Sequence, residues 1–396
     1  MTAITVKNAY KFFGRRSTEA IEQLRGGADA ADVKSLGTAA VIDASFTVEP
    51  GEIFVVMGLS GSGKSTLIRM LNGLLPPTAG EIYVGDEEIG SVDPAELRRI
   101  RQSRISMVFQ HFALLPHRTV LDNAAYALRI QGVGKAEREE RARSALEMVD
   151  MVGWDNHVPA QLSGGMRQRV GLARALAADT DILLMDEAFS ALDPLIRREM
   201  QDQLIELQQS LGKTIVFITH DLNEAMRLGD RIAVMRSGRI VQIDTGEQIL
   251  AHPANDYVAK FIADVDPRTV FQARSLMAKP SVTVTVGQGP RQTLREIRDE
   301  QVPAAFVVDR DRRYVGTVTD TAAFNAQQAG ATTLHDAVEA APSVHEDTLL
   351  AELLNVAASD SHVPVPVVND SGRLVGVIPR VSIWEAMTPY DEEANV

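Results

Sequence analysis

Short apolar runs alternate with amphipathic stretches over roughly the first 262 residues. Strands are predicted where apolar residues run together or alternate, at residues 41–48, 53–57, 105–109, 182–185, 214–219 and 231–235. Helical spacing of apolar residues predicts helices at 64–74, 136–152 and 169–177. Strands that alternate with helices favour an α/β fold with a mostly parallel sheet covered on both faces.

The pattern changes after about Asp266, where the chain shows a loose internal repeat. Residues 305–320 (AFVVDRDRRYVGTVTD) and 365–380 (VPVVNDSGRLVGVIPR) both read as a strand, a polar turn, a second strand with glycine at the matching place (Gly316, Gly376), and then a helix. Two copies of about 60 residues each fit a paired α+β module. We therefore expect three parts: 1–265, 266–330 and 331–390.

Composition narrows the function. A length of 396 residues and 45% hydrophobic content fit two or three domains. The net charge of -13 argues against a nucleic-acid binder, and the lack of cysteine excludes disulfides and cysteine-ligated metals. We expect no signal peptide at the N-terminus. No apolar run approaches the ~20 residues that span a bilayer, so a membrane role would act through a partner.

One glycine-rich turn carries the pattern GxxxxGK[ST] between a predicted strand and a predicted helix. It comprises Gly58, Leu59, Ser60, Gly61, Ser62, Gly63, Lys64 and Ser65, followed by Thr66. Glycines let backbone N–H groups turn toward phosphate oxygens, and the helix N-terminus adds positive potential. Lys64 would reach the β- and γ-phosphates, and the Ser65 hydroxyl would ligate Mg²⁺. The motif predicts ATP binding.

Two further segments fit phosphate chemistry. The strand at 182–185 ends in Asp186, which would hold Mg²⁺, and Glu187, which could act as general base on water. Alone, such an acid pair is more often a solvated turn. Residues 162–168 (LSGGMRQ) place Ser163, Gly164 and Gly165 before a helix, which makes a second anion-binding turn. Alone, that feature reads as an ordinary helix cap.

Together, in this order, these motifs resemble those of ABC-transporter ATPases over about residues 1–262. Residues 162–168, including Gln168, match the signature motif of that family. The resemblance implies a P-loop ATPase domain with a mixed sheet and a helical subdomain at about 111–178. It also implies a dimer in which each ATP lies between the P-loop of one subunit and the signature motif of the other, with two transmembrane permease subunits as partners.

Other site residues follow from the resemblance, position by position. Gln110 matches the glutamine implied to touch Mg²⁺ and to sense the membrane subunits, and His220 matches the histidine implied to contact the γ-phosphate. Asp193 ends the D-loop, Ser-Ala-Leu-Asp. Phe13 occupies the position of the aromatic residue that stacks on adenine; the neighbouring Phe12 and a plain core role remain alternatives.

A closer resemblance is to the ATPase subunits of importers for quaternary amines such as glycine betaine and proline betaine. It rests on the long stretch at residues 15–38, on residues 51–72, 105–123, 162–200 and 214–230, and on the C-terminal repeat, which resembles a tandem CBS module. It implies a peripheral subunit on the cytoplasmic face of the inner membrane, an indirect partner in an extracytoplasmic solute-binding protein, and osmoregulatory import. Selectivity for the solute would reside outside this chain.

The CBS-like repeats depart from the nucleotide-binding pattern Gly-x-x-Thr/Ser-x-x-Asp. After Gly316 comes Thr319, but Ala322 replaces the acid; after Gly376, Pro379 and Ser382 stand at the last two positions. The acid that would accept ribose hydroxyls is missing from both copies. Sensing of ionic strength or of a nucleotide stays open; the arginines that could meet anionic lipid, such as Arg310 and Arg312, are interspersed with acids and fit a solvated surface equally well.

Three other functions compete with this one. The chain could serve an importer for an amino acid or another small solute, whose ATPase domain would look much alike. It could be a soluble ABC ATPase acting on nucleic acid or ribosomes, but it lacks a second ATPase unit, zinc-finger cysteines and a basic charge. It could be an inactive regulator, but Lys64, Ser65, Asp186, Glu187 and His220 are all present.

Overall fold

The computed structural model describes residues 2–110, 113–357 and 362–387 of the chain. These residues form two compact units, Met1–Lys260 and Phe261–Val396. Residues 111–112, at the start of the expected helical subdomain, and 388–390, at the end of the expected third part, lie outside the described residues. None of the described helices has the length and apolar character needed to span a bilayer.

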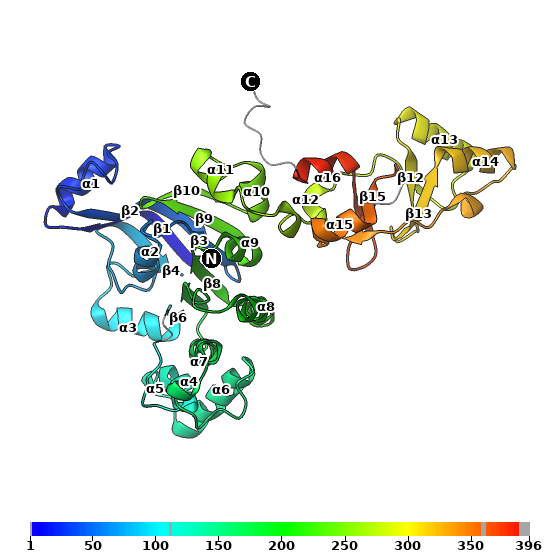
Figure 1. The fold of residues 1–396 in the computed structure, drawn as a ribbon. Coiled ribbons are helices and arrows are strands. Elements are labelled where there is room, and N and C mark those ends of the chain that lie inside the picture. The colour runs from blue at the N-terminus through cyan, green and yellow to red at the C-terminus, as the bar shows by residue number, and fades with distance from the viewer. Residues whose placement is uncertain (1, 111–112, 358–361, 388–396) are drawn as a thin grey trace. The chain divides into compact units, whose positions relative to one another are not determined.

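A six-stranded sheet forms the centre of the first unit (Figure 1). Its strands, in spatial order, are β10 (Arg239–Asp244), β9 (Arg231–Arg236), β3 (Ile53–Met57), β8 (Thr214–Thr219), β7 (Ile182–Asp186) and β6 (Ile105–Val108). All neighbours are parallel except β10 and β9. Every residue of β3, β7 and β8 is buried, as expected of apolar strands with both faces covered. The predicted parallel sheet is thus confirmed.

A second, antiparallel sheet packs on this core. Its order is β2 (Thr38–Val48), β1 (Ile4–Phe13), β4 (Ala79–Val84) and β5 (Glu87–Glu88). Side chains of both sheets and of α2 (Lys64–Leu71) share one hydrophobic core, in which the rings of Phe46 and Phe54 stack at 5.0 Å. The sequence predicted only part of β2, and not β1, because a register shift after Val6 breaks the alternation of β1.

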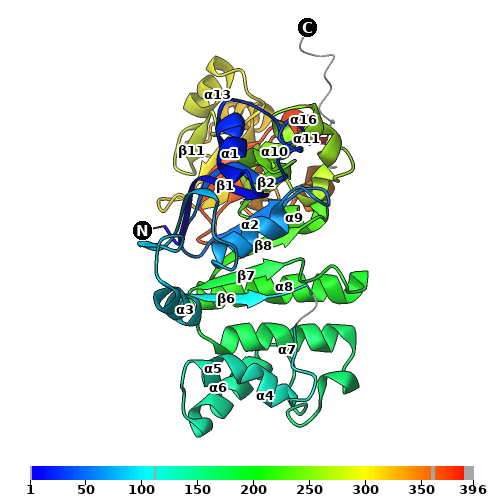
Figure 2. The same ribbon diagram turned by 90° about the vertical axis from the view of Figure 1, so that its left-hand side faces the viewer.

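Short helices form a separate layer beside β6 (Figure 2). They are α4 (Val120–Ala124), α5 (Tyr126–Ile130), α6 (Lys135–Glu147) and α7 (Gly164–Ala177). Three predicted helix boundaries were wrong. The helix expected at 64–74, outside this layer, ends at Leu71. The helix expected at 169–177 begins at Gly164, because the Ser163 hydroxyl caps it by accepting from the N–H of Met166. The helix expected to reach residue 152 ends at Glu147, before Asp150 turns left-handed with φ of 57°.

The remaining helices of the first unit surround the two sheets. They are α1 (Ser17–Arg25), α3 (Pro94–Ser103), α8 (Pro194–Leu211), α9 (Leu222–Leu228), α10 (Gly246–Ala251) and α11 (Asp256–Ile262), the last of which runs into the second unit. Helix α1 and the turns after it account for the long stretch at residues 15–38.

The second unit contains two three-stranded sheets of the same design. One is β11 (Thr283–Thr285), β12 (Ala304–Val308) and β13 (Tyr314–Thr319); the other is β14 (Val344–His345), β15 (Val365–Val368) and β16 (Leu374–Ile378). In each, the first pair is parallel and the second antiparallel. Helices α12 (Ala273–Leu276), α13 (Pro290–Asp299), α14 (Asp320–Gln328), α15 (Leu350–Ala357) and α16 (Arg380–Met387) complete the unit. The predicted repeat is therefore present in the fold.

Candidate functional site

The glycine-rich turn joins β3 to α2, where the sequence predicted it. Gly61 and Gly63 have φ of 80° and 106°, in the left-handed region that favours glycine. A Cβ on Gly63 would also lie 2.2 Å from the carbonyl oxygen of Ala40. The turn therefore requires glycine at this position on grounds of both conformation and space.

Lys64, the first residue of α2, folds back over the turn. Its Nζ donates to the carbonyl oxygens of Gly58 at 2.8 Å and Leu59 at 3.1 Å, and the residue is only 4% exposed. Burial lowers its pKa, against the opposing effect of the nearby Glu187 and Asp186. An ammonium group has three donors, so one remains for an incoming phosphate.

Ser65 and Asp186 meet at the same edge of the sheet. The Ser65 hydroxyl donates to Oδ1 of Asp186 at 3.2 Å. Burial raises the pKa of Asp186, so a bound cation would stabilise its charged form. No group of three or more His, Cys, Asp or Glu that could hold a metal occurs among the described residues. One hydroxyl and one carboxylate suit Mg²⁺, which takes its remaining ligands from substrate phosphates and water.

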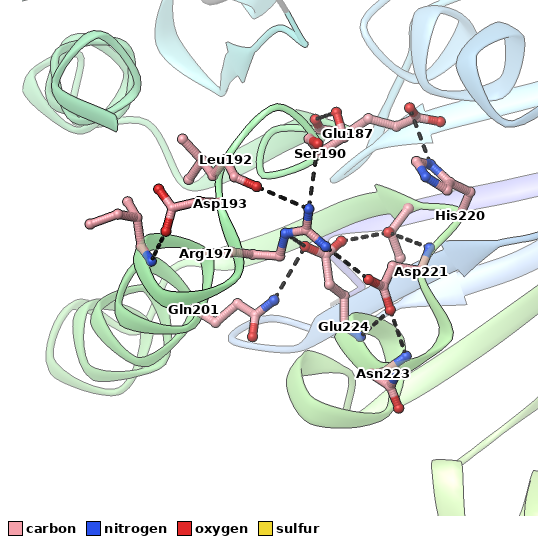
Figure 3. A network of polar contacts seen from close by, with 12 residues as sticks. Glu187, Ser190, Leu192, Asp193, Arg197, Gln201, His220, Asp221, Asn223 and Glu224 are labelled. Atoms are coloured by element: carbon pink, nitrogen blue, oxygen red, sulfur yellow. Dashed lines mark hydrogen bonds and ion pairs between the residues drawn. The ribbon is translucent and has the colours of Figure 1, made fainter. Parts of the chain in front are cut away.

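Glu187 follows β7 and is held between two polar side chains. Its Oε2 lies 3.1 Å from Nε2 of Gln110, after β6. The same oxygen lies 3.4 Å from Nδ1 of His220, after β8 (Figure 3). The strands β6, β7 and β8 are parallel neighbours, so their carboxyl ends meet at one edge. The backbone of Glu187 has φ of 47°, a conformation that costs energy outside glycine and concentrates at functional sites.

The serine–glycine turn begins a different helix, α7, in the helical layer. Ser163 is exposed, and Gly164 and Gly165 form the first turn. Gln168 does not belong to this surface. It is fully buried, and neither polar atom of its amide has a partner within the described chain. The side chain therefore does not lie on the exposed surface of the turn, and its role in nucleotide binding stays a prediction.

The two phenylalanines at the end of β1, Phe12 and Phe13, differ in exposure. Phe13 is 44% exposed, with the ammonium group of Lys11 5.4 Å from the ring centroid. Phe12 is buried in a small core with Tyr10 and residues of α1. Of the two rings, that of Phe13 is the more accessible to a ligand.

Asp193 caps α8 and thereby ends the loop that follows Glu187. Its Oδ1 accepts from the N–H of Ile196 at 3.1 Å. The sequence did not identify the polar residues behind this loop, Arg197, Asp221 and Glu224 (Figure 3). The alternation of charged and apolar residues in α8 is that of any solvated helix, so the sequence did not indicate that Arg197 makes these contacts.

An apolar groove of about 320 Å³ lies between β6 and the helical layer. Its walls include Met107, Phe109, Tyr126 and Ile130, and the last three are 36%, 38% and 50% exposed. The sequence missed this feature because α5 is too short to show a helical period.

The paired glycines of the second unit serve close packing. A Cβ on Gly316 would lie 2.5 Å from the carbonyl oxygen of Glu339, and one on Gly376 would lie 2.5 Å from Sδ of Met277. The Thr319 hydroxyl caps α14 by accepting from the N–H of Ala322. Close packing thus explains both glycines, and helix capping explains the threonine. Neither explanation requires a bound nucleotide.

Comparison with known proteins gives three results. The profile of the family described as ABC transporter matches residues 41–190, and that of the CBS domain matches residues 273–328 and 336–383. The chain is 46% identical over 99% of its length, and 94% of the relative, to the glycine betaine transport ATP-binding protein OpuAA of Bacillus subtilis. It is 45% identical, over 97% of both chains, to the glycine betaine/proline betaine transport system ATP-binding protein ProV of Escherichia coli.

A solved structure shares the fold of the first unit. It is a dimeric ATP-binding cassette in a post-hydrolysis state, bound to ADP and Pi. It is 32% identical with a TM-score of 0.53, and the match covers 61% of this chain and 98% of the other.

Proposed function

The chain belongs to the ATP-binding subunits of ABC transporters, in the betaine group that carries a C-terminal tandem CBS module, and from this premise we propose that it powers import of glycine betaine or a similar small quaternary amine. The chain is an ATPase of the transport type. The observation that carries the catalytic proposal is the meeting of Lys64, Ser65 and Asp186 with Glu187 and its two polar neighbours at one edge of the sheet.

Each group has a distinct task in the proposed site. Lys64 and the N–H groups of residues 58–66 bind the phosphates, and Ser65, Asp186 and Gln110 would hold Mg²⁺, which neutralises charge on the phosphate oxygens. Glu187 accepts a proton from the attacking water, since its carboxylate lies at the same edge of the sheet, beside Gln110 and His220. His220 contacts the γ-phosphate from the neighbouring strand.

The site of one chain is incomplete in this proposal. Phe13 stacks on the adenine of the nucleotide held by its own P-loop, while Ser163, Gly164 and Gly165 bind the γ-phosphate of the nucleotide held by a second copy, near Asp193. Support comes from the two separate helix starts in one chain, α2 and α7, and from the dimeric state named for the similar cassette. Closure of the dimer would exclude bulk water and complete each site.

The apolar groove beside β6 is the proposed docking surface for a membrane subunit. Phe109, on its wall, directly precedes Gln110, so a partner seated in the groove would press on the segment that carries the residue touching Glu187. We propose an assembly of two such ATPases and two membrane subunits, peripheral on the cytoplasmic face of the inner membrane, supplied by an extracytoplasmic binding protein.

The second unit is proposed to regulate turnover. Because both repeats lack the ribose-binding acid, we favour a response to ionic strength over adenosine binding. Ion pairs exposed to solvent weaken as the Debye length falls, from about 10 Å at 0.1 M salt to about 3 Å at 1 M.

The deciding experiment measures ATPase activity of the chain in liposomes with its membrane subunits. Salt is varied, glycine betaine is added with its binding protein, and the series is repeated with the chain cut after Asp264. We expect betaine to stimulate turnover, and only the full chain to require high salt. Stimulation by an amino acid instead of betaine would show that the transporter imports that amino acid. A salt response that is the same in the cut chain would refute the role of the second unit in sensing ionic strength.

A further inference from the structure

Arg197, in the first turns of α8, contacts two loops at once (Figure 3). Its Nη2 donates to the carbonyl oxygens of Leu192 at 3.1 Å and Ser190 at 3.5 Å, both in the loop after Glu187. Its Nη1 donates to Oδ2 of Asp221 at 3.0 Å. The side chain is only 26% exposed. One guanidinium therefore joins the loop after β7 to the loop after β8.

Local hydrogen bonds within residues 219–223 also hold the loop after β8. Asp221 caps α9, accepting from the N–H of Asn223 at 2.9 Å, and its own N–H donates to Oγ1 of Thr219 at 2.9 Å. Thr219 and Asp221 are the two neighbours of His220. Arg197 therefore contacts one of the two neighbours of the histidine directly, and that neighbour is hydrogen-bonded to the other.

The buried carboxylate of Glu224 closes the network. It is 3% exposed, accepts from Thr219 at 2.5 Å and from Gln201 at 3.2 Å, and lies 3.9 Å from Nε of Arg197. Burial raises the pKa of Glu224. A buried acid of this kind is tolerated where a cation and hydrogen-bond donors surround it, and Arg197 is the nearby cation.

We propose that Arg197 is a positioning residue that holds the loop of His220 and the loop between Glu187 and Asp193 in one fixed arrangement. The inference rests on the proposed function, because it concerns turnover at that site. Among the described residues, the hydrogen bonds of the Arg197 side chain go to Asp221, Ser190 and Leu192 and to none of the P-loop residues 58–66. Its loss should therefore displace the groups that act on water and the γ-phosphate, and leave ATP binding by the P-loop intact.

The geometry favours arginine over lysine. Two backbone carbonyls and one carboxylate surround the guanidinium in different directions, and a planar fork with five donors can serve them together. A lysine could keep the contact with Asp221 but would lose the carbonyls of the first loop. The two loops would then move independently.

The test uses the complete transporter with Arg197→Gln, Arg197→Lys and Asp221→Asn, and Arg198→Gln as the matched control, since Arg198 is the exposed neighbour on α8. Steady-state ATPase assays give kcat and KM, and a fluorescent ATP analogue gives Kd. We expect Arg197→Gln to lower kcat about 10- to 100-fold with KM and Kd within about twofold of wild type. Arg197→Lys should fall in between, and the Arg198 variant should match wild type.

The outcomes separate this inference from the function itself. A wild-type transporter without ATPase activity would refute the proposed function. An active wild type with an equally active Arg197→Gln variant would refute only the positioning role, as would equal losses of ATP binding and turnover. Thermal unfolding checks that each variant folds. If Arg197→Gln does not, Asp221→Asn, which keeps the guanidinium, must show the same loss of kcat at constant Kd for the proposal to stand.

Discussion

The side-chain amide of Gln110 donates to the carboxylate of Glu187 at 3.1 Å, across 77 positions of sequence. The same carboxylate oxygen lies 3.4 Å from the ring of His220. A change in the position of either neighbour would therefore move the group that we assign as general base. Because Gln110 also lies next to the groove proposed for the membrane subunit, this contact gives a direct physical route between partner and chemistry.

Glu187→Gln is expected to abolish turnover and keep ATP binding. The amide has nearly the same shape as the carboxylate, so the phosphate cradle is undisturbed, but the charged acceptor for the water proton is lost. General-base removal of this kind costs about 10²- to 10⁴-fold in kcat.

Static light scattering provides the second measurement on this variant. With ATP present and hydrolysis blocked, the protein should persist as a dimer. A monomer at saturating ATP would contradict the shared-site arrangement, whatever the ATPase assay shows.

Lys64→Ala should lose nucleotide affinity instead. Removal of a charge-assisted contact to phosphate is worth about 1.5–3 kcal/mol, or roughly 10- to 100-fold in Kd. Calorimetric titration with ATP measures this directly. Normal hydrolysis by this variant would show that the glycine-rich turn is not the nucleotide site.

The parts of the site that could be predicted from sequence are those whose residue types are dictated locally. Gly63 is required by a positive φ and a close carbonyl, and the strand of Asp186 is apolar because both faces of the sheet are covered. Such constraints determine the residue types of a short stretch, so they can be recognised in the sequence of that stretch alone.

The rest depends on contacts between distant segments. Nothing near Arg197 in the sequence indicates that it meets Asp221, 24 positions away. The burial of Gln168 was missed for the same reason, since a glutamine three residues past a surface turn faces inward only because of how α7 packs. The groove beside β6 combines residues around β6 with residues of α5 and α7; β6 and α7 could be predicted from their patterns, but α5 and the way the three meet could not.

Tyr314→Phe is expected to stabilise the second unit. The hydroxyl is buried and has no hydrogen-bond partner among the described residues, and burial raises its pKa to about 12. Removing an unsatisfied buried hydroxyl should gain on the order of 1 kcal/mol.

The pH dependence gives a sharper check on Tyr314. Below about pH 10 the tyrosine is neutral in both the folded and the unfolded state, so it does not change how the free energy of unfolding varies with pH. Between about pH 10 and pH 12 the unfolded chain loses this proton while the folded chain keeps it, so stability falls as pH rises. Urea unfolding at pH 9 and pH 11 should show that the wild type loses more stability than the phenylalanine variant. Equal losses would mean that the hydroxyl is not buried.

Ile130→Glu is expected to prevent assembly with the membrane subunits without impairing the ATP site. Ile130 is half exposed on the wall of the groove, and it lies on α5, away from Lys64 and Glu187 in sequence and in fold. Burying an isoleucine at an interface contributes about 1.5–3 kcal/mol, and a carboxylate in its place adds a desolvation cost. Val152→Glu is the control, because Val152 is 70% exposed in the same helical part but does not line the groove. Co-purification with the membrane subunits should fail for the first variant and succeed for the second, while both bind ATP with wild-type affinity. If both assemble normally, the membrane subunit docks elsewhere, and the contact between Gln110 and Glu187 is not the route by which it reaches the chemistry.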